Sequence, residues 1–72
     1  MPTTSDVETA LSTLSQRLMP GDMFSARQVA HELGADDDAS AKAVARVLAT
    51  LPHVVAKTIG AHVNPDALWG FG

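Results

Sequence analysis

The segment 24–51 constrains the fold of this 72-residue chain more than any other stretch. Within it, Ser25 and Gln28 have the spacing of a capping box, in which each side chain binds a backbone amide that the start of a helix leaves unpaired. Gly34 is the residue type that ends helices in a left-handed conformation, and Pro52 cannot continue a helix. The pattern therefore predicts two helices joined by a tight turn that contains glycine.

Apolar residues mark the buried face of each of these two helices. In the first, over about residues 26–33, Phe24 and Val29 have the positions of a hydrophobic staple across the cap. In the second, the apolar spacing is i, i+3, i+4 and i+7, at Val44, Val47, Leu48 and Leu51. Aspartates 36–38 precede this helix, where carboxylates cap backbone amides and interact well with the helix dipole. Its outward face is predicted to hold Ala39, Lys42, Ala43, Arg46 and either Ala49 or Thr50.

The N-terminal part of the chain predicts one further helix. Ser5 and Glu8 repeat the capping-box spacing after a frayed start at residues 1–4. The apolar face of this helix consists of Val7, Ala10, Leu11, Leu14 and Leu18. A turn at Pro20-Gly21 ends it, and a short extended stretch over residues 22–24 leads into the capped segment.

Beyond Pro52 the residue types become those of a β-hairpin. The β-branched residues suit a first strand, at Val54, Val55, Thr58 and Ile59. Residues 67–71 are predicted to form the second strand, and its two aromatic residues to close the core beneath the hairpin. Asn64-Pro65-Asp66 has turn chemistry, with Gly60 as a bulge or bend. A hairpin centred on that turn pairs Val63 with Leu68 and His62 with Trp69.

The length and composition of the chain exclude several classes of protein. A chain of this length makes one domain, residues 1–72, and the lack of cysteine excludes disulfides and thiolate metal sites. No apolar run reaches the roughly 20 residues that cross a bilayer, and the N-terminus lacks the features of a signal peptide, so we expect a cytoplasmic protein. Ala35 breaks the zinc-protease motif that His31-Glu32 begins. Catalytic nucleophiles, phosphate-binding glycine loops and paired carboxylates are also missing, so we expect no enzyme activity, cofactor, metal or small-molecule substrate.

The formal charge of −3 is unevenly distributed along the chain. Residues 1–38 hold two basic residues against seven acidic ones. Residues 39–72 hold Lys42, Arg46 and Lys57 against Asp66. The overall acidity weighs against tight nucleic-acid binding, whereas the second half of the chain supplies positive charge.

The order helix, extended stretch, helix, turn, helix and hairpin resembles the winged-helix variety of the helix-turn-helix fold. FSARQVAHELG is similar to the second helix of that family, AKAVARVLATL to its third helix, and VVAKTIGAHVNPDALWGF to its strand-turn-strand wing. The resemblance covers roughly residues 5–71. It implies the α+β fold class, as a small winged-helix-like domain with three helices followed by a C-terminal β-hairpin.

In winged-helix proteins that bind DNA, the third helix enters the major groove and the wing touches the backbone or the minor groove. The resemblance therefore implies a non-enzymatic regulator of transcription. Carried over by position, the residues that would meet DNA are Ser40, Lys42 and Arg46 from the third helix, Lys57, His62 and Asn64 from the hairpin, and Arg27 and Gln28 at the start of the second helix.

Protein recognition is the alternative, because the same fold also serves that purpose. It would make the chain an adaptor or inhibitor that docks on a larger complex, such as one that processes nucleic acid. The few cations and the alanine-rich third helix favour this alternative, because phosphate contacts and base readout need charged and polar groups. The surface it would use consists of Asp36, Asp37, Asp38, Ala39 and Ala43. The sequence leaves both the partner and the oligomeric state open.

Overall fold

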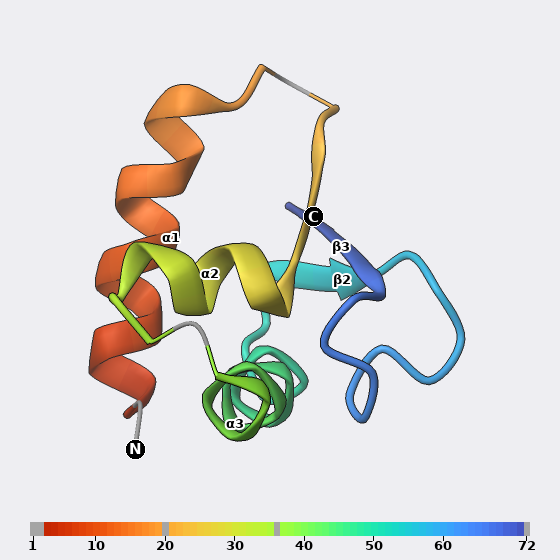
Figure 1. Cartoon of the computed structure of the whole chain (residues 1–72). Coiled ribbons are helices and arrows are strands. Elements are labelled where there is room, and N and C mark those ends of the chain that lie inside the picture. Colours follow the sequence, from red (N-terminus) through yellow and green to blue (C-terminus); the bar gives the residue numbers. More distant parts are fainter. Residues whose placement is uncertain (1–2, 20, 36, 72) are drawn as a thin grey trace.

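The computed structural model of the chain describes residues 3–19, 21–35 and 37–71. In chain order these residues form α1 (Thr4–Arg17), β1 (Met23–Ser25), α2 (Ala26–Glu32), α3 (Asp38–Leu48), β2 (Val54–Ala56) and β3 (Leu68–Phe71). The strands make one antiparallel sheet in the order β1-β3-β2 (Figure 1). This α+β arrangement of three helices and a small sheet is compatible with a winged-helix-like fold.

The start of α1 corrects one sequence prediction. Thr3, not Ser5, is the N-cap, and it forms a capping box with Asp6. The amide of Asp6 donates to Thr3 Oγ1 at 3.1 Å, and the amide of Thr3 donates to Asp6 Oδ2 at 3.2 Å. The spacing that predicts a cap at Ser5 also occurs two residues earlier, and the earlier cap lengthens the helix. Thr3 and Thr4 therefore belong to the helix start, whereas residues 1 and 2 of the predicted frayed segment lie outside the described residues.

The two ends of α2 form as the sequence predicts. The amide of Gln28 donates to Ser25 Oγ at 3.2 Å, and the amide of Ser25 donates to Gln28 Oε1 at 2.8 Å. Gly34 has a φ of 74°, in the left-handed region that favours glycine. This conformation lets the amide of Ala35 donate to the carbonyl of Ala30 at 2.9 Å. Both the capping box and the glycine terminus are confirmed.

Small side chains let α3 pack closely on α2. The buried face of α3 contains two alanines as well as the expected apolar residues, and consists of Ala41, Val44, Ala45 and Leu48. Val47, predicted to be buried, is only half-buried, because the contact face of the helix turns toward the alanines. Leu51 is buried as predicted, although the helix itself already ends at Leu48. In Figure 1, α3 is seen almost end-on below α2.

The observed sheet differs from the predicted two-stranded hairpin. The residues preceding α2 form a third strand, β1, and β3 lies between β1 and β2. Phe24 and Ala56 lie opposite Trp69 from its two sides, so the prediction that His62 faces Trp69 is wrong. Likewise, Leu68 pairs with Ser25 and not with Val63.

A long connection replaces the tight hairpin turn. The first strand ends at Ala56, and residues 57–67, here called the wing loop, form a series of turns. The predicted turn does form, because the amide of Ala67 donates to the carbonyl of Asn64 at 3.2 Å. It lies beside β3 and not at the tip of the hairpin. Gly60, with a φ of 77°, makes a separate bend in the loop.

The core joins one face of the sheet to the three helices. Phe24 is its largest fully buried side chain, and Trp69 is also buried, as predicted. Phe71 is only partly buried, with 39% of its surface exposed, and its ring lies 5.0 Å from the ring of Phe24. Phe24 thus connects the sheet to the helices.

Candidate nucleic-acid interface

Four of the residues expected to contact DNA have partners within the protein. Gln28 belongs to the capping box of α2. Ser40 Oγ donates to Asp37 Oδ1 at 2.8 Å. Asn64 Oδ1 accepts from the amide of Asp66 at 3.0 Å. These side chains, and Arg27 with them, hold the fold in place, which explains their residue types without reference to DNA.

Arg27 is the most strongly held of the four. Its Nη1 lies 2.8 Å from Asp38 Oδ1, and its Nε lies 2.7 Å from Asp66 Oδ1. Hydrogen bonds that the Arg27 guanidinium donates to Asp66 and then to Asp38 raise its pKa. The amide of Arg27 also donates to the carbonyl of Pro65 at 3.0 Å. This arginine clamp ties the starts of α2 and α3 to the wing loop, so its charge is already matched by carboxylates.

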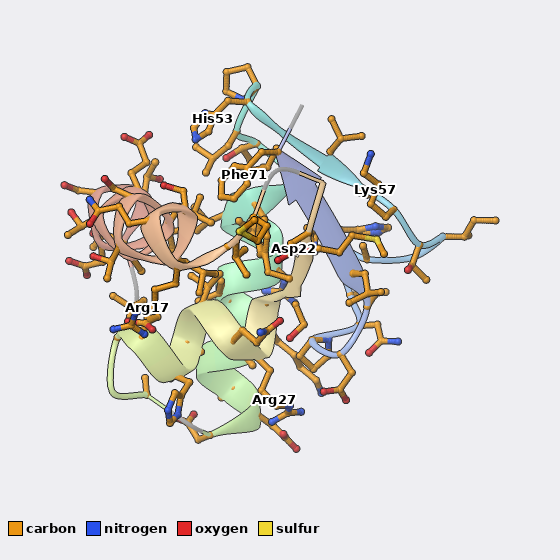
Figure 2. All side chains as sticks on the ribbon, turned by 90° about the horizontal axis from the view of Figure 1, so that it is seen from above. Arg17, Asp22, Arg27, His53, Lys57 and Phe71 are labelled. Carbon is orange, nitrogen blue, oxygen red and sulfur yellow. The ribbon has the colours of Figure 1, made fainter. Side chains whose placement is uncertain are left out.

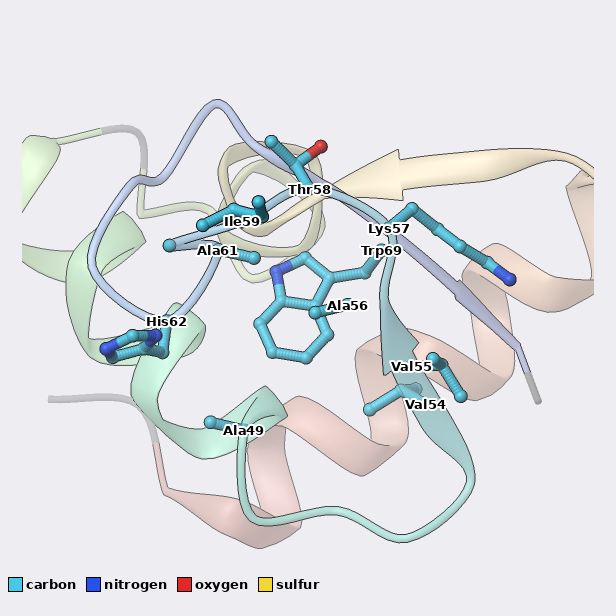
Figure 3. Close-up of a pocket in the computed structure, with 11 residues that line it drawn as sticks. Ala49, Val54, Val55, Ala56, Lys57, Thr58, Ile59, Ala61, His62 and Trp69 are labelled. Carbon is cyan, nitrogen blue, oxygen red and sulfur yellow. The ribbon is translucent and has the colours of Figure 1, made fainter.

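Lys42 and Arg46 are the basic residues that the fold leaves available on α3. They lie one turn apart on the exposed face of the helix, and neither forms an ion pair with a described residue. His62 is exposed in the wing loop, where it lines the same hollow as Ala49 at the end of α3 (Figure 3). The structure therefore places Lys42, Arg46 and His62 along α3 and the adjoining loop.

Lys57 lies elsewhere. A Cβ atom built on Gly70 would lie 2.6 Å from Lys57 Cε, so the lysine stem runs over β3 at Gly70. Figure 3 shows the Lys57 side chain extending away from His62 and Ala49, and Figure 2 shows it far from Arg27. Lys57 is exposed, but the structure does not bring it to the face of α3.

The residues of the alternative, protein-binding surface have mixed surroundings. Asp36 lies outside the described residues. Asp37 caps α3 and Asp38 pairs with Arg27, so both carboxylates have structural partners. Ala39 is exposed and Ala43 is half-buried. An apolar and acidic surface is present at the start of α3, but its charge is partly matched within the protein.

The Asp37 cap predicts a pH-dependent contribution to stability. Hydrogen bonds from the side chain and then the amide of Ser40 lower the pKa of the Asp37 carboxyl. Because the pKa is lower in the folded state, the ionised cap stabilises the protein above the ordinary aspartate pKa. That contribution is lost as the pH falls through the lowered value.

We therefore expect Asp37→Asn to lower the melting temperature at neutral pH, and the difference from wild type to shrink as the pH falls below the ordinary aspartate pKa and through the lowered value. Asparagine still caps helices, so the variant isolates the charge. Melting curves recorded across this range check the prediction, with Glu8→Gln as the control for removing an exposed carboxylate. A difference that stays constant down to the lowest pH would show that the ionised cap contributes nothing.

Sequence reasoning misses a hollow of about 600 Å³ beside β2. Trp69, which is 3% exposed, lines it together with Ala49 at the end of α3 and residues 58–62 of the wing loop (Figure 3). The predicted hairpin does not contain this hollow, because it places Thr58 and Ile59 in the first strand and not in a loop. A local signal does exist: Gly60 interrupts the β-branched run and favours a bend.

The chain matches no protein-family model, no curated protein and no solved structure. Among the described residues, no helix is long and apolar enough to cross a membrane. The same part of the chain contains no group of three potential ligands that could hold a metal ion. The case for a function therefore depends on the surface charges and the hollows of the fold.

Proposed function

We propose that this protein is a non-enzymatic regulator of transcription that binds duplex DNA with the exposed face of α3 and the adjoining wing loop. The distribution of unpaired positive charge supports this function. Arg17 pairs with Glu32, and Arg27 pairs with two aspartates. Of the three remaining lysine and arginine residues, none of which has an ion pair among the described residues, two stand on α3.

The charges around α3 favour one direction of approach. Asp37 and Asp38 lie at the start of the helix, where they repel phosphates. Arg27 offsets part of the negative charge of Asp38 and Asp66. DNA is therefore expected to approach the middle and C-terminal end of α3, next to the wing loop, and not the leading end of the helix.

The number of available cations sets the expected strength of binding. Each neutralised phosphate contributes about −0.9 to the slope of log affinity against log salt concentration. Lys42 and Arg46 together give a slope of about −1.8. The alanine-rich face of α3 supplies few groups for reading base edges, so phosphate contacts dominate.

A salt titration of DNA binding tests the proposal. Fluorescence anisotropy of a labelled duplex, measured from about 20 to about 200 mM salt, is expected to give binding with a slope of about −1.8. Absence of binding at the lowest salt concentration would contradict the proposal, since electrostatic attraction is then strongest.

Protein recognition is the second candidate function, and a specific observation favours it. Ile59 is fully exposed and Val63 is 60% exposed, both in the wing loop. Apolar side chains do not neutralise phosphates, but they bury well against another protein. This observation points to the wing loop as the protein-binding surface, and not to the aspartates at the start of α3.

A further inference from the structure

The hollow beside β2 has mainly apolar walls and no acidic lining residue. Strand β2 forms one side, Ala49 at the end of α3 forms another, and residues 58–62 of the wing loop form the third (Figure 3). Trp69 lies between them. The two basic or titratable residues that line it are His62 and Lys57, although the Lys57 side chain runs over Gly70 and away from His62. Its shape and charge suit an apolar group that lies next to a carboxylate.

Strand β2 presents an unused edge to this hollow. It lies at the edge of the sheet, opposite β3 in the register Val55↔Gly70. The amide of Lys57 donates to the carbonyl of Leu68, which lies directly opposite, so Lys57 and Val55 face β3 in the alternating antiparallel pattern. The backbone groups of Val54 and Ala56 therefore point away from β3. Such an edge can pair with another extended chain.

A buried polar atom lies at the same place. The indole Nε1 of Trp69 is buried and has no hydrogen-bond acceptor among the described residues. Figure 3 shows this nitrogen directed toward Ile59 and Ala61, which also line the hollow. A buried N–H group without an acceptor is destabilising, so an acceptor brought in by a partner stabilises the site.

We propose that the hollow beside β2 binds an extended peptide segment of a partner protein. The peptide adds a strand to β2 by hydrogen bonding to the backbone of Val54 and Ala56. One of its apolar side chains packs against the lining of the hollow over Trp69, and an adjacent carboxylate interacts with His62. This binding activity goes beyond the proposed DNA-binding function, with which it shares His62 and the wing loop but not Lys42 or Arg46.

A second copy of this chain fits the edge less well. Two β2 strands paired antiparallel about Val55 would place His53 of one copy opposite Lys57 of the other. Such a pairing brings no carboxylate to His62, because residues 53–57 contain no acidic residue. Duplex DNA also fits poorly, because the hollow is mainly apolar. The complementary chemistry is that of a peptide with alternating apolar residues and an acidic neighbour.

Selection from a random-peptide display library tests the inference on the full-length protein. Enriched peptides are expected to share alternating apolar positions and an acidic residue, and to lack proline in the pairing stretch. Trp69 is the single tryptophan of the chain, so a bound peptide should change the intrinsic fluorescence. The variant Ala56→Pro removes an edge N–H that β3 does not use, and should weaken binding by about tenfold or more.

A second pair of variants keeps the test decisive if Ala56→Pro fails to fold. Ala49→Gln extends a neutral side chain at the rim of the hollow and should weaken peptide binding. Its matched control, Ala39→Gln, lies exposed on the same helix outside the hollow and should bind peptide like wild type. The double variant Lys42→Ala/Arg46→Ala should also retain peptide binding, which separates this site from the DNA surface.

Three results would overturn the inference. The first is a library that yields no enriched peptide. The second is a set of peptides that bind Ala49→Gln as tightly as wild type and leave the Trp69 fluorescence unchanged. The third is a wild-type dimer in sedimentation that Ala49→Gln or Ala56→Pro converts to monomer, since a second copy would then be the natural occupant of the edge.

Discussion

Replacing Phe24 with alanine is expected to destabilise the protein by about 3–5 kcal/mol, because the change removes the largest fully buried side chain and leaves a cavity. Phe24 packs in the common core, and its strand holds β3 against the helices. A domain of this size has a free energy of unfolding at or below about 5–15 kcal/mol. The variant is therefore expected to be largely unfolded or close to it.

The matched control for this change is Phe71→Ala. Phe71 is the same residue type, packs against the ring of Phe24 and lies in the neighbouring strand, but 39% of its surface is exposed. Its truncation is expected to cost about 1–2 kcal/mol, from a partial loss of burial and of the ring contact. Urea unfolding followed by circular dichroism measures both. Equal midpoints for the two variants would show that the core is not centred on Phe24.

The second large effect is expected on DNA binding. Removing both basic side chains of the exposed α3 face, in Lys42→Ala/Arg46→Ala, deletes two of the three expected phosphate contacts. The salt slope should fall in magnitude by about 1.8, and binding at low salt should weaken by about tenfold or more. Stability should change little, because both side chains are exposed and lack ion pairs among the described residues.

Arg17→Ala is the control for that double variant. Arg17 is also a cation on a helix, but it pairs with Glu32 and lies on α1. Its removal also makes the net charge more negative, by one unit where the double variant changes it by two. Because α3 is left intact, DNA binding should stay close to that of wild type. If Arg17→Ala and the double variant weakened binding equally, general charge and not the face of α3 would determine the affinity.

The helices are the part of the fold that the sequence predicts best. Their signals are local: the capping box of Ser25 and Gln28 and the glycine terminus at Gly34 both form as predicted. The one local error concerns α1, where the same cap spacing occurs at Thr3 and at Ser5. Local patterns identify a helix well, but they do not choose between two equivalent starts.

The sheet shows why the remainder could not be predicted. The turn at Asn64-Pro65-Asp66 forms, yet the strand register depends on Phe24 and Trp69, which come from distant parts of the chain and share one face of the sheet. Strand β1 pairs with β3, which lies far away in the sequence, and no local sequence pattern predicts such a pairing. The wing loop is consequently longer than a tight hairpin, and the hollow beside β2 arises from that length.

The candidate site was likewise predictable in part from local sequence and in part not. The sequence identifies the residue types that could meet a phosphate, but not the partners they find in the fold. Arg27 is the clearest example, since its carboxylate partner Asp66 is 39 residues away. Lys57 is exposed as expected, yet the register turns it over Gly70 and away from α3. Lys42, Arg46 and His62 are exposed on or beside α3 and have no ion pair among the described residues, and their contact with DNA stays a prediction.

The arginine clamp fixes the position of the wing loop, which carries His62, relative to α3, which carries Lys42 and Arg46. By joining the starts of α2 and α3 to the wing loop, Arg27 holds the loop beside the helix that carries the unpaired cations. This explains how an acidic domain can still present a locally positive surface. It also explains why His62 and Arg46 are expected to act on one ligand.

The most direct test of this account is the mapping of amide chemical shifts of the ¹⁵N-labelled protein as a DNA duplex is added at low salt. The account predicts that the perturbed amides lie within residues 42–50 of α3 and its end and residues 58–64 of the wing loop. Perturbations confined to α1 or to the strand face that carries Met23 and Val55, or no perturbation at all, would contradict it.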